Sequence, residues 1–148
     1  MKEALVRRWA HAPWHCWIKE QPEWVDIFAE LWVRLPHAAV KQLLCAPREL
    51  IVLPPPNQAR VVRVMSPLLM GASIVQLDSQ LLARPRDEVV AILAHEFAHL
   101  CTMIADDELK NDLAADHLVR VWGFEDELRQ ALTRDLAGDH PRLLALAS

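Results

Sequence analysis

The chain has 148 residues, of which 53% are hydrophobic and 24% charged, which excludes a disordered chain and suffices for one packed domain. The formal net charge of −4 argues against nucleic acid or an anionic membrane as the main binding partner. Residues 1–86 hold 11 Lys and Arg against 7 Asp and Glu (+4), whereas residues 87–148 hold 5 against 13 (−8). Either these are two solvated faces of opposite sign, or some of the late carboxylates converge on a cation.

The sequence shows no segment for export or for crossing a membrane. No run approaches the roughly 18 apolar residues that span a bilayer, and the first residues lack the apolar core of a signal peptide. Cys16, Cys45 and Cys101 are odd in number and widely spaced, which argues against a disulfide framework. We therefore expect a single cytoplasmic domain with no membrane span and no nucleic-acid partner.

Residues 1–48 are expected to form a helical N-terminal region. The segment Glu23–Leu35 predicts an amphipathic helix, because its apolar residues recur at i, i+3 and i+4. A second, short helix is expected over His37–Ala46, between two prolines. Tryptophans are frequent in residues 9–32, where we favour them as core anchors, with a surface for a protein partner as the alternative.

Residues 49–80 predict a small sheet. Strand character is expected in Leu50–Leu53, in Arg60–Met65 and in Ala72–Leu77, which are rich in β-branched residues. Short strands at this spacing indicate a three-stranded antiparallel or mixed sheet.

Residues 85–136 return to a helical pattern. One helix is expected from Asp87 to Leu100, and a turn at Asp106-Asp107 separates it from a second helix over Glu108–Trp122. A third helix is expected over Glu125–Leu136. Helices before and after a small sheet predict an α+β fold in one domain covering residues 1–148.

The first of these late helices contains His95-Glu96-Phe97-Ala98-His99, an H-E-x-x-H motif. Residues four apart share one helix face, so both imidazoles can reach one metal ion. Glu96 lies about 100° around the helix from His95, where its carboxylate could hold and deprotonate a metal-bound water. The uncharged residues on both sides of the motif indicate a buried active-site helix.

A catalytic zinc site needs a third protein ligand and an open position. If the two helices run antiparallel about a turn before Asp106, His99 lies level with Asp112 and His95 lies level with Asp116. Asp112 is therefore the candidate third ligand, and Asp116 is the candidate acceptor for the second N–H group of His95. For either aspartate taken alone, a solvated helix face is the alternative.

The combination of His95-Glu96-x-x-His99 with Asp112-Leu113-Ala114-Ala115-Asp116 resembles the H-E-x-x-H … E-x-x-A-D pattern of the gluzincin metallopeptidases, and most of all their HtpX and CaaX-prenyl-protease branch. The segment Ile74–Leu77 takes the place of that family's edge strand, which pairs with extended substrate. Asp139-His140-Pro141 is similar to a His-Pro element after the metal site in that branch. The resemblance covers roughly residues 72–141, and this chain has Asp112 where the family has glutamate.

The resemblance implies a soluble, minimal zincin-like metallopeptidase domain. Together with the elements expected above, this gives N-terminal helices, a short three-stranded sheet, the H-E-x-x-H helix and an antiparallel partner helix. It implies one Zn²⁺ per chain, held by His95, His99 and Asp112. Peptide or protein substrates would be hydrolysed by a metal-bound water that Glu96 activates. The chain has no tyrosine to stabilise an oxyanion, so the candidates are His140, which has the family-like context, and the alternatives His117 and Arg120.

Two other functions stay open at this point. One is a zincin-fold module that keeps the metal but cleaves nothing, and the other is a metal-free domain that binds a protein partner through its tryptophan-rich helices. A second histidine cluster, at His11, His15 and Cys16, could also hold a metal. Because Pro13 interrupts the helix that this cluster would need, we expect packing or surface roles for these residues.

Overall fold

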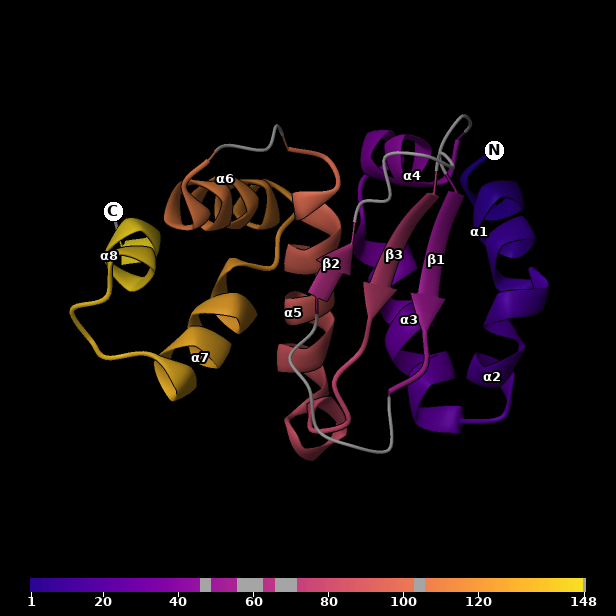
Figure 1. Ribbon diagram of the computed structural model, residues 1–148, viewed down its shortest axis with the longest axis horizontal. Coiled ribbons are helices and arrows are strands. Elements are labelled where there is room, and N and C mark those ends of the chain that lie inside the picture. Colours follow the sequence, from indigo (N-terminus) through magenta and orange to yellow (C-terminus); the bar gives the residue numbers. More distant parts are fainter. Residues whose placement is uncertain (46–48, 56–62, 66–71, 103–105, 148) are drawn as a thin grey trace.

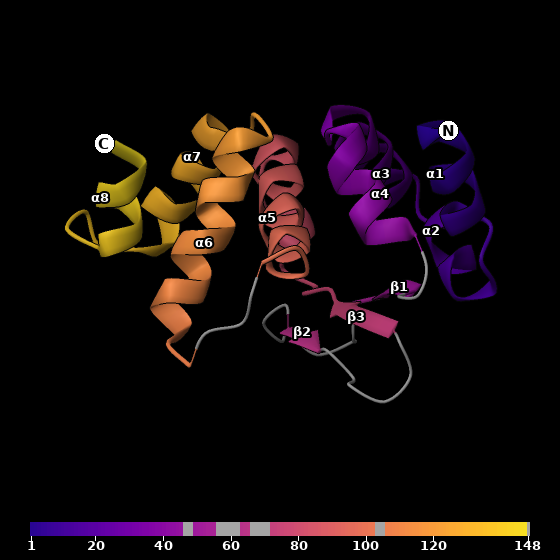
Figure 2. The ribbon, with the colours of Figure 1, turned by 90° about the horizontal axis from the view of Figure 1, so that it is seen from above.

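A computed structural model describes residues 1–45, 49–55, 63–65, 72–102 and 106–147 (Figure 1). Viewed from above, the helices lie on one side of the sheet, and helix α5 (Arg86–His99) stands between the N-terminal helices and the C-terminal ones (Figure 2). The fold class is α+β, as the sequence predicts. Within the described ranges, no helix has both the length and the apolar character that a membrane span requires.

The N-terminal region is helical, as expected. Its segments are α1 (Lys2–Ala10), the 3₁₀ helix η1 (Pro13–His15), α2 (Cys16–Lys19), α3 (Pro22–Arg34) and α4 (His37–Leu44). The helices predicted over residues 23–35 and 37–46 correspond to α3 and α4. Helix α4 ends at Leu44, and Ala46 lies outside the described residues.

Helix α3 packs its apolar face against α5, the helix that carries the H-E-x-x-H motif. Trp24 and Leu31 are 0% exposed and Trp32 is 3% exposed, so the face is removed from water. Each such burial stabilises the fold by about 1.5–3 kcal/mol. The Trp32 ring lies 5.4 Å, centroid to centroid, from Phe97 of α5. This packing holds the face of α5 that carries Phe97 against α3. Trp24 and Trp32 therefore belong to the core.

The sheet has the strand order β1-β3-β2. Strands β1 (Glu49–Leu53) and β3 (Ala72–Gln76) are parallel, and β2, described at Arg63–Met65, runs antiparallel to β3. Residues 60–62 of the predicted second strand lie outside the described residues. The expectation that Ile74–Leu77 forms an edge strand is wrong, because β3 has a hydrogen-bonded partner on both sides and is the central strand.

The outer edge of β1 is closed by side chains from the N-terminal helices. Trp9 Nε1 donates to the carbonyl oxygen of Leu50, and Trp17 Nε1 donates to that of Val52, each at 3.1 Å. The Val52 backbone N–H donates to His15 Nε2 at 3.1 Å, and His15 Nδ1 donates to the Trp9 carbonyl oxygen at 2.7 Å. Both ring nitrogens of the fully buried His15 are thereby used, which supports its expected packing role. An edge covered in this way cannot pair with another strand.

The C-terminal half holds η2 (Leu81–Ala83), α5, α6 (Glu108–Val121), α7 (Glu125–Asp135) and α8 (Pro141–Ala147). The three predicted late helices correspond to α5, α6 and α7. Gly123 ends α6 with φ at +84°, a backbone conformation that favours glycine. Helix α8 was not predicted from the sequence.

Helices α5 and α7 are joined by an ion pair between a buried carboxylate and a largely exposed arginine. Glu88 of α5 is 2% exposed, and its carboxylate accepts hydrogen bonds from Arg134 Nε at 3.1 Å and Nη2 at 2.7 Å. This bidentate pairing satisfies a carboxylate that would otherwise be costly to bury.

Candidate metal centre

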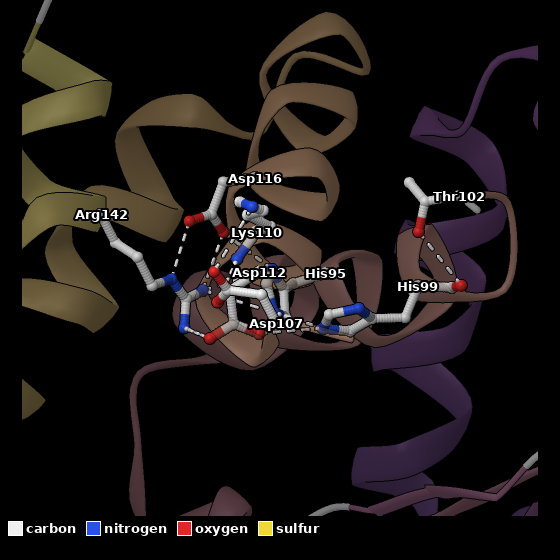
Figure 3. A network of polar contacts seen from close by, with 8 residues as sticks. All are labelled: His95, His99, Thr102, Asp107, Lys110, Asp112, Asp116 and Arg142. Carbon is white, nitrogen blue, oxygen red and sulfur yellow. Dashed lines mark hydrogen bonds and ion pairs between the residues drawn. The ribbon is translucent and has the colours of Figure 1, made fainter. Parts of the chain in front are cut away.

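His95 and His99 project from one face of α5 toward α6 (Figure 3). The apolar side of α5, with Ala94, Phe97 and Ala98 all 0% exposed, holds the helix in the core and leaves the histidines on the opposite side. His95 is 6% exposed, and its Nε2 atom lies 3.0 Å from Nε2 of His99. The Nε2 atoms of the two imidazoles therefore lie close enough to bind the same metal ion.

Two aspartates of α6 complete the cluster. Oδ1 of Asp112 lies 3.3 Å from His99 Nε2 and 3.8 Å from His95 Nε2. Oδ1 of Asp116 lies 2.8 Å from His95 Nδ1, which donates to it. Both aspartates stand one turn apart on α6, so the helical repeat alone places them on one face. The structure thus brings together the four residues that the sequence singled out, with His99 beside Asp112 and His95 beside Asp116.

The chemistry and spacing of these atoms fit a divalent cation. Two Zn²⁺ ligand atoms at about 2.05 Å from a tetrahedral ion are roughly 3.3 Å apart. The three separations observed here, 3.0, 3.3 and 3.8 Å, scatter around that value. Because Asp116 accepts the Nδ1–H group of His95, the Nε2 atom of that ring carries the lone pair, and it faces His99 Nε2 at 3.0 Å. Among the described residues, His95, His99 and Asp112 form the one group that brings three such ligand atoms together.

Arg142 of α8 is a member of the cluster that the sequence analysis missed. Its Nε and Nη2 atoms donate to the two carboxylate oxygens of Asp116, each at 2.7 Å, and its Nη1 donates to Oδ2 of Asp112 at 3.1 Å. Nη2 also lies 3.3 Å from each ring nitrogen of His95. No spacing rule points to Arg142, because it comes from a helix outside the motif. The neighbouring His140-Pro141 was the only sequence signal close to it.

The charges in this cluster shift one another's pKa values. Burial acts to raise the pKa of Asp112, but hydrogen bonds from His95 and His99 and the charge of Arg142 lower it well below its usual range. The pKa of Asp116 is lowered in the same way by His95 and Arg142, against the effect of burial. Burial acts to lower the pKa of His95, and its two aspartate partners more than reverse this. Both carboxylates are therefore ionised across the neutral pH range and attract a cation.

Glu96 is partly buried next to the cluster. Burial raises the pKa of its carboxyl, and the charges of His95 and His99 lower it again only in part. A raised pKa brings a carboxylate closer to the range in which it accepts a proton efficiently at neutral pH.

The three candidates for oxyanion stabilisation, His117, Arg120 and His140, differ in their surroundings. His117 is exposed on α6, and Arg120 is exposed and forms an ion pair with Glu125 at 3.0 Å. His140 is partly buried, and its Nδ1 accepts the backbone N–H of Arg142 at 3.3 Å.

In the second histidine group, Nδ1 of the exposed His11 donates to the Arg7 carbonyl oxygen at 2.8 Å, which is a surface role.

Comparison with models of protein families, with curated proteins and with solved structures finds no match to this chain. The resemblance to gluzincin metallopeptidases therefore stays a prediction from the motif residues.

Proposed function

We propose that this protein is a zinc-dependent metallopeptidase of zincin-like fold that hydrolyses peptide bonds in a peptide or protein substrate. The observation that carries the proposal is the convergence of His95 Nε2, His99 Nε2 and Asp112 Oδ1. Glu96 follows His95 directly in the H-E-x-x-H motif. The contacts of His99 with Asp112 and of His95 with Asp116 support an antiparallel arrangement of α5 and α6, as a zincin site requires.

In this proposal, His95, His99 and Asp112 hold one Zn²⁺, and Asp116 orients the His95 ring through its Nδ1–H group. A bound zinc supplies Lewis-acid chemistry, polarising the substrate carbonyl and acidifying a water. Glu96 accepts a proton on its carboxylate from the attacking water and can later deliver it to the leaving amine. The raised pKa of Glu96 favours this exchange.

The charge of the cluster also supports a divalent cation. With both imidazoles neutral, as metal ligands must be, Asp112, Asp116 and Glu96 contribute three negative charges when ionised, and Arg142 contributes one positive charge. Two negative charges remain in a partly buried site, and a divalent ion neutralises them. Buried charges are otherwise expensive to keep unpaired.

The test compares zinc-loaded wild-type protein with Glu96→Gln on unfolded casein and on a peptide library. Zinc content should stay the same, while hydrolysis falls by roughly 10²–10⁴-fold, the usual worth of a general base. Glu108→Gln is the matched control, because Glu108 is exposed at the start of α6 and should leave the rate unchanged. A zinc-loaded Glu96→Gln protein that cleaves at the wild-type rate would refute the role of Glu96.

A second candidate is a zincin-fold module that binds zinc and cleaves nothing. It is favoured by the positions of the oxyanion candidates, since His117 is exposed, Arg120 pairs with Glu125 and the chain has no tyrosine. Zinc bound to the wild-type protein without cleavage of either substrate would favour this module.

A further inference from the structure

All four carboxylate oxygens of the two aspartates are held by partners in the cluster. Oδ1 of Asp112 faces the two imidazole Nε2 atoms, and its Oδ2 accepts from Arg142. Oδ1 of Asp116 accepts from both His95 and Arg142, and its Oδ2 accepts from Arg142. A carboxylate is free to rotate about its last bond unless both oxygens are held. Arg142 is thus the group that turns the Oδ1 atoms toward the histidines (Figure 3).

The shape of the guanidinium matters for this arrangement. Its planar set of N–H groups spans Asp116 with Nε and Nη2 and reaches Asp112 with Nη1, so one rigid group bridges two residues one helical turn apart. The Arg142 side chain is only 13% exposed, and all three of its nitrogens are engaged. It is therefore not free to take up a substrate group, and its contacts are those of a residue that positions others.

Helix α8 is held in place by contacts that do not involve the cluster. Leu143 and Leu146 are buried, and Arg129 of α7 donates to the carbonyl oxygen of Leu146. These contacts fix the helix that presents Arg142 to α6. The site accordingly depends on a C-terminal segment that lies beyond the H-E-x-x-H helix and its partner.

We propose that Arg142 is a positioning residue of the cation site, which makes α8 a part of that site. It fixes Asp112 so that one oxygen faces the cation, and it fixes Asp116 so that His95 presents Nε2. The inference rests on the proposed function only in requiring that the cluster binds a divalent cation, and it does not require catalysis.

The experiment measures binding of Co²⁺ to the full-length chain after removal of metal with a chelator. The dissociation constant and the visible absorption spectrum of bound Co²⁺ are compared for the wild type, Arg142→Gln, Arg142→Lys and Arg134→Gln. Arg134 is the matched control, because it also pairs in bidentate fashion with a buried carboxylate, that of Glu88, but away from the cluster. The spectrum reports the ligand geometry, which a general loss of stability does not alter.

Loss of the bridging group should weaken Co²⁺ binding by about 10- to 100-fold in Arg142→Gln, as for other residues that orient metal ligands. Arg142→Lys keeps the charge but not the planar bridge, so it should bind at least about threefold more weakly and show a changed spectrum. It also keeps the test decisive if Arg142→Gln does not fold. Arg134→Gln should retain the wild-type affinity and spectrum.

Unchanged or tighter Co²⁺ binding by a folded Arg142 variant, with the wild-type spectrum, would overturn the positioning role and leave the proposed function standing. A wild-type protein that binds Co²⁺ but cleaves no peptide would refute the peptidase and leave the role of Arg142 intact. A wild-type protein that binds no Co²⁺ would overturn both.

Discussion

The substitution Asp116→Asn removes one negative charge from the most buried carboxylate of the cluster and barely changes its shape. Asp116 is 2% exposed and accepts three hydrogen bonds of 2.7, 2.7 and 2.8 Å from Arg142 and His95. An asparagine keeps one oxygen acceptor but turns an N–H group toward a donor. Breaking a buried ion pair on one side costs about 3–5 kcal/mol. Because Arg142 keeps its 3.1 Å bond to Asp112, we expect a value near the lower end, about 3 kcal/mol.

The assay is urea unfolding of metal-free protein, followed by the fluorescence of buried tryptophans such as Trp24 and Trp32. Asp135→Asn is the control, since Asp135 also accepts two hydrogen bonds of 2.8 Å from one arginine, Arg84, but is 44% exposed. An exposed pair of this kind contributes at most about 1 kcal/mol. Equal losses below about 1 kcal/mol for both variants would refute the view that the Asp116–Arg142 pair is a buried, structure-fixing contact.

Two further predictions concern the scaffold. Burial lowers the pKa of His15 below its ordinary value of 6.5, and the bond to Trp9 offsets this only in part, so the folded state holds His15 neutral. The stability that neutral His15 contributes is therefore complete above pH 6.5 and is lost as the pH falls below that value. A folded His15→Gln variant should accordingly show a flatter decline in melting temperature between pH 7 and pH 5 than the wild type. An identical decline in the two proteins would contradict this. Gly123→Ala should lower the free energy of unfolding in urea by about 1 kcal/mol, because φ at Gly123 is +84°. The control Gly138→Ala should change this free energy little. Equal effects of the two substitutions would argue against backbone strain at the end of α6.

Most of the helices, and the two histidines of the cluster, can be predicted from local patterns in the sequence. The recurrence of Trp24, Ile27, Phe28 and Leu31 marks α3, and the four-residue spacing of His95 and His99 places two imidazoles on one face of α5. The positions of Asp112 and Asp116 required one assumption in addition, a tight turn between two helices. Periodicity and a short connection thus suffice to place four side chains together.

The parts that were missed depend on contacts between distant segments. Helix α8 is short and begins at Pro141, directly after Gly-Asp-His, so its pattern is too brief to predict a helix. Nothing local indicates that Arg142 reaches α6. The position of β3 depends on which strands pair, and each strand has similar β-branched composition. His15 is a further example, because its role comes from Trp9 and Val52, which approach it only in the folded chain.

The central claim is that His95, His99 and Asp112 bind one zinc ion, and zinc analysis of protein purified without a histidine tag tests it most directly. The wild type should contain about one zinc per chain, and His99→Ala should contain less than about a tenth of an equivalent. His11→Ala is the control, because His11 is exposed and is not one of the three candidate ligands, so this variant should keep the full zinc content. A wild-type protein without zinc after purification and zinc dialysis, or a His99→Ala variant with the wild-type content, would contradict the account.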